Sequence, residues 1–205
     1  MSKPTVEMRE LPILMATDPV RAILAGRKTQ VRRPMKPQPP EEPLSESHKK
    51  WGNVDGRHYY CGIKSPYQVG DLLYVRETWC LVNDTDYGGE LWVDYRATPR
   101  YDESLPAGWH NAPDDLEALK WRLAIHMPKW ATRLWLAVVK VREERLQEIT
   151  VEGIITEGLQ SHFREHDAVI DLRTQFARLW NSIYGKKYPW ESNPRVWVYD
   201  FKVAE

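Results

Sequence analysis

The sequence carries a local cluster of basic residues near its N-terminus. Six basic residues and no Asp or Glu fall between positions 21 and 36: Arg21, Arg27, Lys28, Arg32, Arg33 and Lys36. The whole chain has 29 Lys+Arg and 29 Asp+Glu, for a formal net charge of +0, so the cluster is a local excess of positive charge. A patch of this kind is typical of a phosphate-binding surface, although a solvated helix-turn-strand face has the same composition.

Alternation along an extended segment decides which of these cations can act together. From position 28 onward, even and odd positions take opposite faces of a strand, which sets Lys28, Gln30 and Arg32 against Thr29, Val31 and Arg33. Because Val31 favours the core, we expect Lys28 and Arg32 to point toward a cleft or solvent. Lys28 can act as a base only if its pKa falls well below the ordinary value, through burial or through the neighbouring arginines.

Three other residues are candidates for a binding surface. Arg76 and Glu77 end an apolar strand, where charged side chains can line the mouth of a pocket. Trp190 lies in a loop, and a tryptophan that stacks on a base contributes about 1–3 kcal/mol. The tryptophans on predicted strands are expected to be core residues, so Trp190, in its loop, is the candidate for a surface contact.

Few residues suit a metal ion. His58 and Cys61 have a ligand-like spacing, with Cys80 as a third candidate, but zinc sites usually have a second close pair. We therefore expect neither a metal nor another cofactor.

Two cysteines cannot form a disulfide framework, and no apolar run is long enough to cross a membrane. These features favour a cytoplasmic protein with no membrane partner.

The elements that must position these residues indicate an α+β fold. A length of 205 residues favours a single domain over 1–205. Alternating or apolar runs predict strands at 11–16, 29–33, 72–77, 91–95, 132–141 and 195–203, and helical spacing predicts helices near 17–25, 150–158 and 163–183. Two stretches rich in proline or irregular in pattern, about 34–69 and about 98–121, are interpreted as insertions. Short strands with flanking helices predict a small curled sheet or barrel.

Three segments resemble the ASCH family of PUA-like β-barrels. They are Ile23–Thr29, Gly70–Leu73 and Arg145–Ile149, followed by a tryptophan-rich terminal strand. More closely, Ala25–Arg33, Gly70–Trp79 and Asn193–Phe201 are similar to the longer phage and prophage members. The order and spacing of these segments cover most of the chain outside the two insertions.

This resemblance implies a barrel with a cleft that binds RNA or a nucleoside. One bacterial branch of the family hydrolyses N4-acylated cytidines with a lysine base, a threonine nucleophile and a glutamate acid. The lysine corresponds to Lys28 and the glutamate to Glu157, whereas the nucleophile position is Val31. Thr29 is the nearby hydroxyl, although alternation puts it on the opposite face from Lys28.

These observations predict binding of RNA or of a modified nucleoside or nucleotide. The expected cleft includes Lys28, Arg32, Arg76, Glu77 and Glu157; Arg27, Arg33 and Trp190 are further nucleic-acid contacts. One alternative is a hydrolase that needs no metal, either an N4-acylcytidine amidohydrolase or a ribonuclease, with Lys28, Glu157 and Thr29 as catalytic residues. Another is a phage accessory protein that binds a host protein. Steep weakening of binding by salt would distinguish phosphate contacts from an apolar protein interface.

Overall fold

The computed structural model of the chain describes residues 8–39, 52–54, 57–60, 62–83, 91–100 and 120–204. The strands are β1 (Glu10–Leu14), β2 (Gln30–Pro34), β3 (Gly52–Val54), β4 (Arg57–Tyr60), β5 (Ile63–Lys64), β6 (Leu72–Arg76), β7 (Trp79–Asn83), β8 (Leu91–Tyr95), β9 (Trp135–Arg145) and β10 (Arg195–Val203). The helices are α1 (Thr17–Leu24), α2 (Val151–Thr156) and α3 (Glu165–Tyr184), with 3₁₀ turns η4 (Ala124–His126), η5 (Lys129–Ala131), η6 (Leu146–Glu148) and η7 (Trp190–Ser192).

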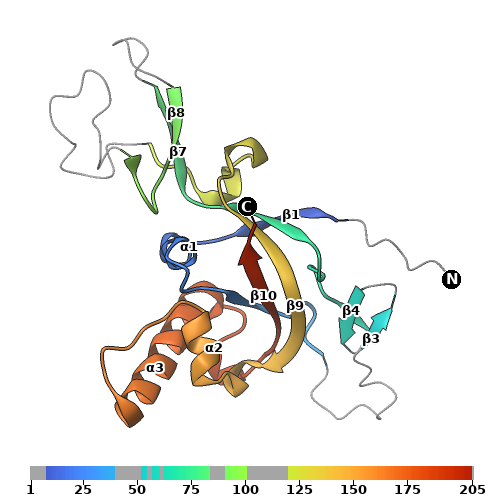
Figure 1. The fold of residues 1–205 in the computed structure, drawn as a ribbon. Helices are drawn as coiled ribbons and strands as arrows, with labels where there is room; N and C mark the ends of the chain where they lie inside the picture. The colour runs from blue at the N-terminus through green and yellow to red at the C-terminus, as the bar shows by residue number, and fades with distance from the viewer. Residues whose placement is uncertain are drawn as a thin grey trace.

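A five-stranded sheet in the order β1-β6-β9-β10-β2 is the centre of the fold (Figure 1). β1 pairs with β6 in parallel, and the other three pairs are antiparallel. β9 and β10 form its long middle, and their register shifts between Asp200 and Phe201. The prediction that segments near 72–77, 132–141 and 195–203 lie in one sheet is therefore confirmed, as is the α+β class.

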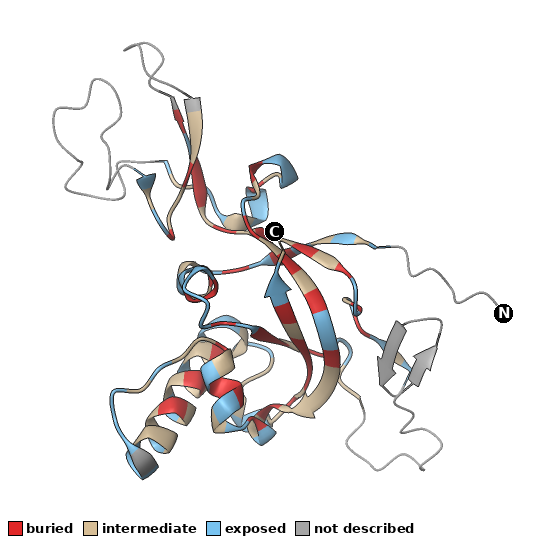
Figure 2. Cartoon of the chain, viewed as in Figure 1, coloured by how far each residue is buried: buried red, intermediate tan, exposed pale blue. Residues whose placement is uncertain are grey.

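Alternation along the strands creates two apolar clusters on opposite faces of this sheet. In β10, Trp197 and Tyr199 belong to one cluster, together with Val31. Val196 and Val198 belong to the other, which α3 covers with Leu172, Phe176 and Trp180. Figure 2, which colours the chain by burial, shows buried, intermediate and exposed positions alternating along α3. The predicted helix over 163–183 is thus confirmed as an outer layer on the sheet.

The sheet does not close into a barrel. Among the described residues no ladder joins the edge strands β1 and β2, so the predicted barrel is not seen. Side chains span this gap, which we call the seam. Arg33 Nη2 donates to the carbonyl of Leu14 at 2.6 Å, and the Tyr67 hydroxyl donates to the carbonyl of Pro12 at 2.7 Å. Side-chain hydrogen bonds, and not a backbone ladder, therefore connect to the edge strand β1 at the seam.

The two expected insertions differ from each other. Much of 98–121 lies outside the described residues, as do 40–51, 55, 56 and 61 of the stretch 34–69. In the described part of 34–69, β3, β4 and β5 form a small antiparallel sheet. β7 and β8 form a separate two-stranded antiparallel ladder, and Figure 1 shows it projecting away from α2 and α3. In the described part of the chain, no helix combines the length and apolar character needed to cross a membrane.

Candidate functional site

A cavity of about 410 Å³ lies on the seam between β2, α3 and the segment that joins β1 to α1. We call it the first cavity. Its walls are mostly apolar, and include Leu14, Met15, Pro19, Val31, Phe176, Leu179, Trp180 and Ile183. Its charged lining residues are Lys28, Arg32, Arg33 and Glu157. A mostly apolar cavity with a few converging polar groups is the usual form of a small-molecule site.

Lys28 and Glu157 form a buried ion pair in this cavity. Their side chains are 4% and 5% exposed, and Lys28 Nζ contacts Glu157 Oε2 directly. The same ammonium donates to the main-chain carbonyl of Glu157 at 3.0 Å. An antiparallel β-bridge also joins the two backbones. The resemblance and the spacing therefore predicted a pair that the fold does bring together.

Arg32 links this pair to the sheet. Its Nη1 lies 3.1 Å from Glu157 Oε1 and 2.6 Å from Gln30 Oε1, and its Nη2 lies 3.0 Å from Glu144 Oε2. Lys28, Gln30 and Arg32 therefore share one face, as alternation predicted. They point into a buried polar network, not toward open solvent.

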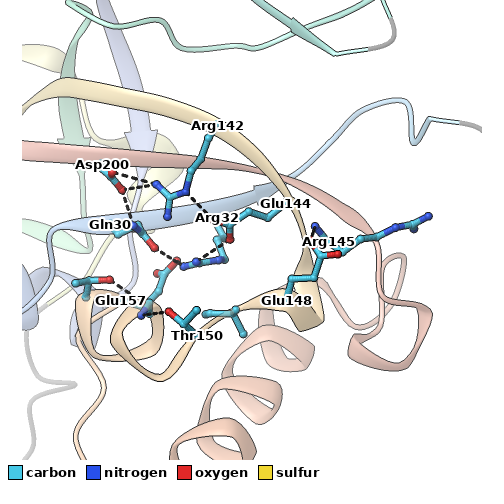
Figure 3. Close-up of polar contacts among 12 residues, drawn as sticks. Gln30, Arg32, Arg142, Glu144, Arg145, Glu148, Thr150, Glu157 and Asp200 are labelled. Carbon is cyan, nitrogen blue, oxygen red and sulfur yellow. Dashed lines mark hydrogen bonds and ion pairs between the residues drawn. The ribbon is translucent and has the colours of Figure 1, made fainter. Parts of the chain in front are cut away.

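Carboxylates from the two long strands complete the network (Figure 3). Arg142 of β9 donates to Glu144 at 2.6 Å and to Asp200 at 2.9 Å, and Gln30 donates to Asp200 at 2.5 Å. Sequence reasoning missed Arg142, Glu144 and Asp200. The signal was present, because charged residues recur at every second position of β9 on the face that meets the helices.

α2 holds Glu157 in place. The Thr150 hydroxyl accepts from the Gly153 amide at 3.0 Å and caps the helix, as its position before the helix predicted. A Cβ on Gly153 would lie 3.0 Å from Arg32 Nη2, so the missing side chain leaves space for the guanidinium. After Glu157, Gly158 has φ +95°, and a Cβ there would lie 2.7 Å from Ala22 Cβ. Glycine is thus required where α2 passes close to α1.

Burial lowers the pKa of Lys28 from its ordinary value. Desolvation is the largest cause, and the contacts with Glu157 oppose it; Arg33 and Arg32 lower it further. The direction agrees with the sequence-based expectation, although burial contributes more than the neighbouring arginines. A lysine with a lowered pKa can donate or accept a proton nearer neutral pH than an exposed one.

Two further members of the basic cluster, Arg27 and Arg21, donate to backbone carbonyls. Arg27 is exposed and donates to the carbonyl of Gly158 at 2.8 Å, and Arg21 donates to that of Ala97 at 2.7 Å. Thr29 is exposed, and its amide donates to the Thr156 carbonyl. Thr29 therefore points away from the network that contains Lys28.

Arg76 and Glu77 do not join Lys28. Glu77 is 1% exposed, and its two oxygens accept from Arg133 at 2.9 and 3.0 Å. Arg76 lines a neighbouring cavity and bonds to the Ile125 carbonyl. Glu77 therefore lines neither cavity, whereas Arg76 lines the one beside the first, because strand alternation gives a face and not the cavity that the face borders.

Trp190 is not an open surface ring. It lies in η7 and packs edge-to-face on Phe176 of α3, with ring centroids 5.9 Å apart. It is partly buried in the apolar cluster between α3 and the sheet, and it does not line the first cavity. Its predicted stacking on a base remains a prediction.

Of the candidate metal ligands, Cys61 and the side chain of His58 lie outside the described residues. Cys80 is buried, and burial raises its thiol pKa to about 12. Within the described ranges, no group of three His, Cys, Asp or Glu residues could hold a metal ion.

Family models, curated proteins and solved structures show no match to this chain.

Proposed function

We propose that the first cavity binds a modified nucleoside by its base. The observation that carries the proposal is the pairing of Lys28 with Glu157 inside a mostly apolar cavity. Lys28 would donate to a ring carbonyl, and Glu157 would accept from an exocyclic amine, as carboxylates do from the amino group of cytosine. The apolar walls would cover the faces of the ring.

The two side chains have the hydrogen-bonding capacity for this role. An ammonium has three donors, and Lys28 uses two of them on Glu157. A carboxylate has about four acceptor sites, and Glu157 uses one for Lys28 and one for Arg32. In addition, Arg32 Nε is buried without a partner in the described structure. A polar ligand edge would complete these groups.

The ion pairs that Lys28 and Arg32 form with carboxylates favour a nucleoside over a long RNA as the ligand. Lys28 and Arg32 are 4% exposed and compensated by carboxylates, so neither is an open phosphate contact. Arg27 is exposed and could still contact a phosphate. If RNA binds, we propose that it inserts one unpaired base into the cavity and makes few backbone contacts.

We also propose that the fold is of the PUA-like ASCH type. The segments that carry the resemblance form the end of α1 with β2, β6, and β10. β2 and β10 carry Arg32 and Asp200 of the network around Lys28 and Glu157. Arg33 of β2, Arg76 of β6 and Trp197 of β10 line the cavity next to the first one, and this common location supports the proposal.

A metal-independent amide hydrolase is a second candidate. The lowered pKa of Lys28 favours it, because the neutral amine could take a proton from an attacking water. Val31 lines the same cavity and offers no nucleophile. Turnover would therefore depend on activated water, and we place binding first.

The proposal is tested by calorimetric titration with cytidine, N4-acetylcytidine, uridine and short single-stranded RNAs. We expect cytidines to bind more tightly than uridine, because uridine lacks the amine that Glu157 would accept. Glu157→Gln should reduce this preference, whereas Glu191→Gln, at an exposed position, should not. Equal binding of cytidine and uridine, or no binding of any of them, would refute the proposed recognition.

A further inference from the structure

A second cavity, of about 370 Å³, opens on the same seam next to the first. Both cavities are lined by Leu14, Arg33 and Tyr184, so these three residues form the wall between them. Arg33 Nη1 donates to the Tyr184 hydroxyl at 2.5 Å, and its Nη2 donates to the Leu14 carbonyl at 2.6 Å. A ligand that fills the first cavity would therefore have the second one immediately beside it.

The charge of the second cavity has a single sign. Arg33, Lys36 and Arg76 line it, and no Asp or Glu does. The first cavity differs, because Glu157 neutralises its lysine. Lys36 is exposed and forms no ion pair or hydrogen bond with the described residues. Three cations without a carboxylate favour an anion with more than one negative charge.

Buried donors without acceptors also line the second cavity. Trp197 is 1% exposed, and its indole Nε1 has no hydrogen-bond partner among the described residues. Arg76 Nε is also buried, and it too has no hydrogen-bond partner within the described ranges. Buried polar groups in folded proteins almost always have a partner. Both residues line the second cavity, and their unpaired N–H dipoles add to the positive potential that its cations create.

Tyr184 adds a donor at the wall. Its hydroxyl accepts from Arg33, so its own proton remains to be donated. Phosphate has several oxygens that accept at once, and arginine forks match this geometry. A carboxylate would leave more of these donors unpaired.

We propose that the second cavity binds the phosphate group of a nucleoside monophosphate whose base occupies the first cavity. The placement of the base rests on the proposed function, whereas the anion site rests on its own cations and unpaired donors. The natural ligand would thus be a nucleotide and not a free nucleoside.

The test compares three probes by calorimetry at constant ionic strength: cytidine, cytidine 5′-monophosphate and inorganic phosphate. We expect the monophosphate to bind at least about tenfold more tightly than cytidine, the effect of one hydrogen bond to a charged group. Inorganic phosphate should compete with the monophosphate and leave cytidine binding unchanged. Chloride at the same ionic strength serves as the control for screening.

Variants of the second cavity locate the phosphate. Lys36→Met, Arg76→Met and Trp197→Phe should each weaken monophosphate binding by about three- to tenfold and leave cytidine binding unchanged. Lys36 is exposed, so its replacement tests the site even if Arg76→Met or Trp197→Phe folds poorly. Lys202→Met removes an exposed lysine of β10 outside both cavities and should leave all three affinities unchanged.

The outcomes separate the two proposals. If cytidine and its monophosphate bind equally and inorganic phosphate does not compete, the second cavity is not a phosphate site, and the proposed function is unaffected. If inorganic phosphate binds and Lys36→Met weakens it while cytidine does not bind, the anion site is supported and the proposed function is wrong. Loss of monophosphate binding in Lys202→Met alone would also overturn the assignment.

Discussion

Lys28 and Glu157 are joined twice, once by a β-bridge between their backbones and once by an ion pair between their side chains. They lie 129 positions apart in the sequence, so this contact fixes the end of α2 to the start of β2. Since the same two side chains line the first cavity, the contact shapes the cavity as well as contributing its polar groups.

We predict that the stability of the fold falls strongly when only one charge of the Lys28–Glu157 pair is removed. Glu157→Gln leaves Lys28 and part of Arg32 buried without compensation and should lower the free energy of unfolding by about 3–5 kcal/mol. The double variant Lys28→Met, Glu157→Leu should recover most of the loss, because Arg32 retains Glu144. Urea denaturation monitored by circular dichroism measures both.

The matched control for this prediction is Glu191→Gln. Glu191 is exposed, and its replacement should change stability by no more than about 0.5 kcal/mol. If Glu157→Gln proves as mild as this control, the ion pair does not hold α2 against β2.

The lowered pKa of Lys28 predicts a pH dependence with a definite sign. Between the folded-state pKa and 10.5, the ordinary value, the unfolded chain binds this proton and the folded chain does not. Stability therefore gains from rising pH in that window, and the cost of burying the charged form applies below it. The free energy of unfolding of the wild type should rise relative to that of Lys28→Met as pH approaches 10.5. Parallel curves for the two proteins would contradict the lowered pKa.

The cap of α2 should affect both folding and binding. Thr150→Ala removes the acceptor for the Gly153 amide and should cost about 0.5–2 kcal/mol. Nucleoside affinity should fall too, because α2 presents Glu157 to the cavity. Thr150→Ser keeps the hydroxyl and should restore both quantities. If serine fails to restore them, the role of Thr150 is not that of a helix cap.

Hydrolysis of N4-acetylcytidine should be absent or slow in the wild type. General acid–base help contributes about 10²–10⁴-fold and does not replace a missing nucleophile. Val31→Thr adds a hydroxyl at a position that lines the cavity. If a variant gains hydrolytic activity, we expect it to be this one. Chromatographic assay of cytidine release measures it. Efficient wild-type turnover that is lost in Lys28→Ala would show that the protein is an enzyme.

The strands that border the site could be predicted because their patterns are local. Leu73 and Val75 alternate within β6, and the residues of β2 alternate in polarity, so the shared face of Lys28 and Arg32 was visible in the sequence. The cap and the glycine at the ends of α2 are local signals as well.

The partners of these residues could not be predicted in the same way. Glu144 and Asp200 reach Arg32 and Gln30 only because β9, β10 and β2 are neighbours in the sheet. Glu77 was placed in the wrong site because its partner, Arg133, lies 56 positions further along the chain. Pairings of this kind depend on strand order, which hydrophobic patterning leaves undetermined.

The open seam leaves the edge strands β1 and β2 exposed to strand addition by a second copy of the chain. Each of its edge strands contains a proline, Pro12 in β1 and Pro34 in β2. Proline has no amide hydrogen to offer an incoming strand, and in sheets it is confined to edges and strand starts. Neither edge is therefore a good template for strand addition. The gap that borders the cavities is thereby protected against edge-to-edge self-association, and the five-stranded sheet should not extend into a second copy through β1 or β2.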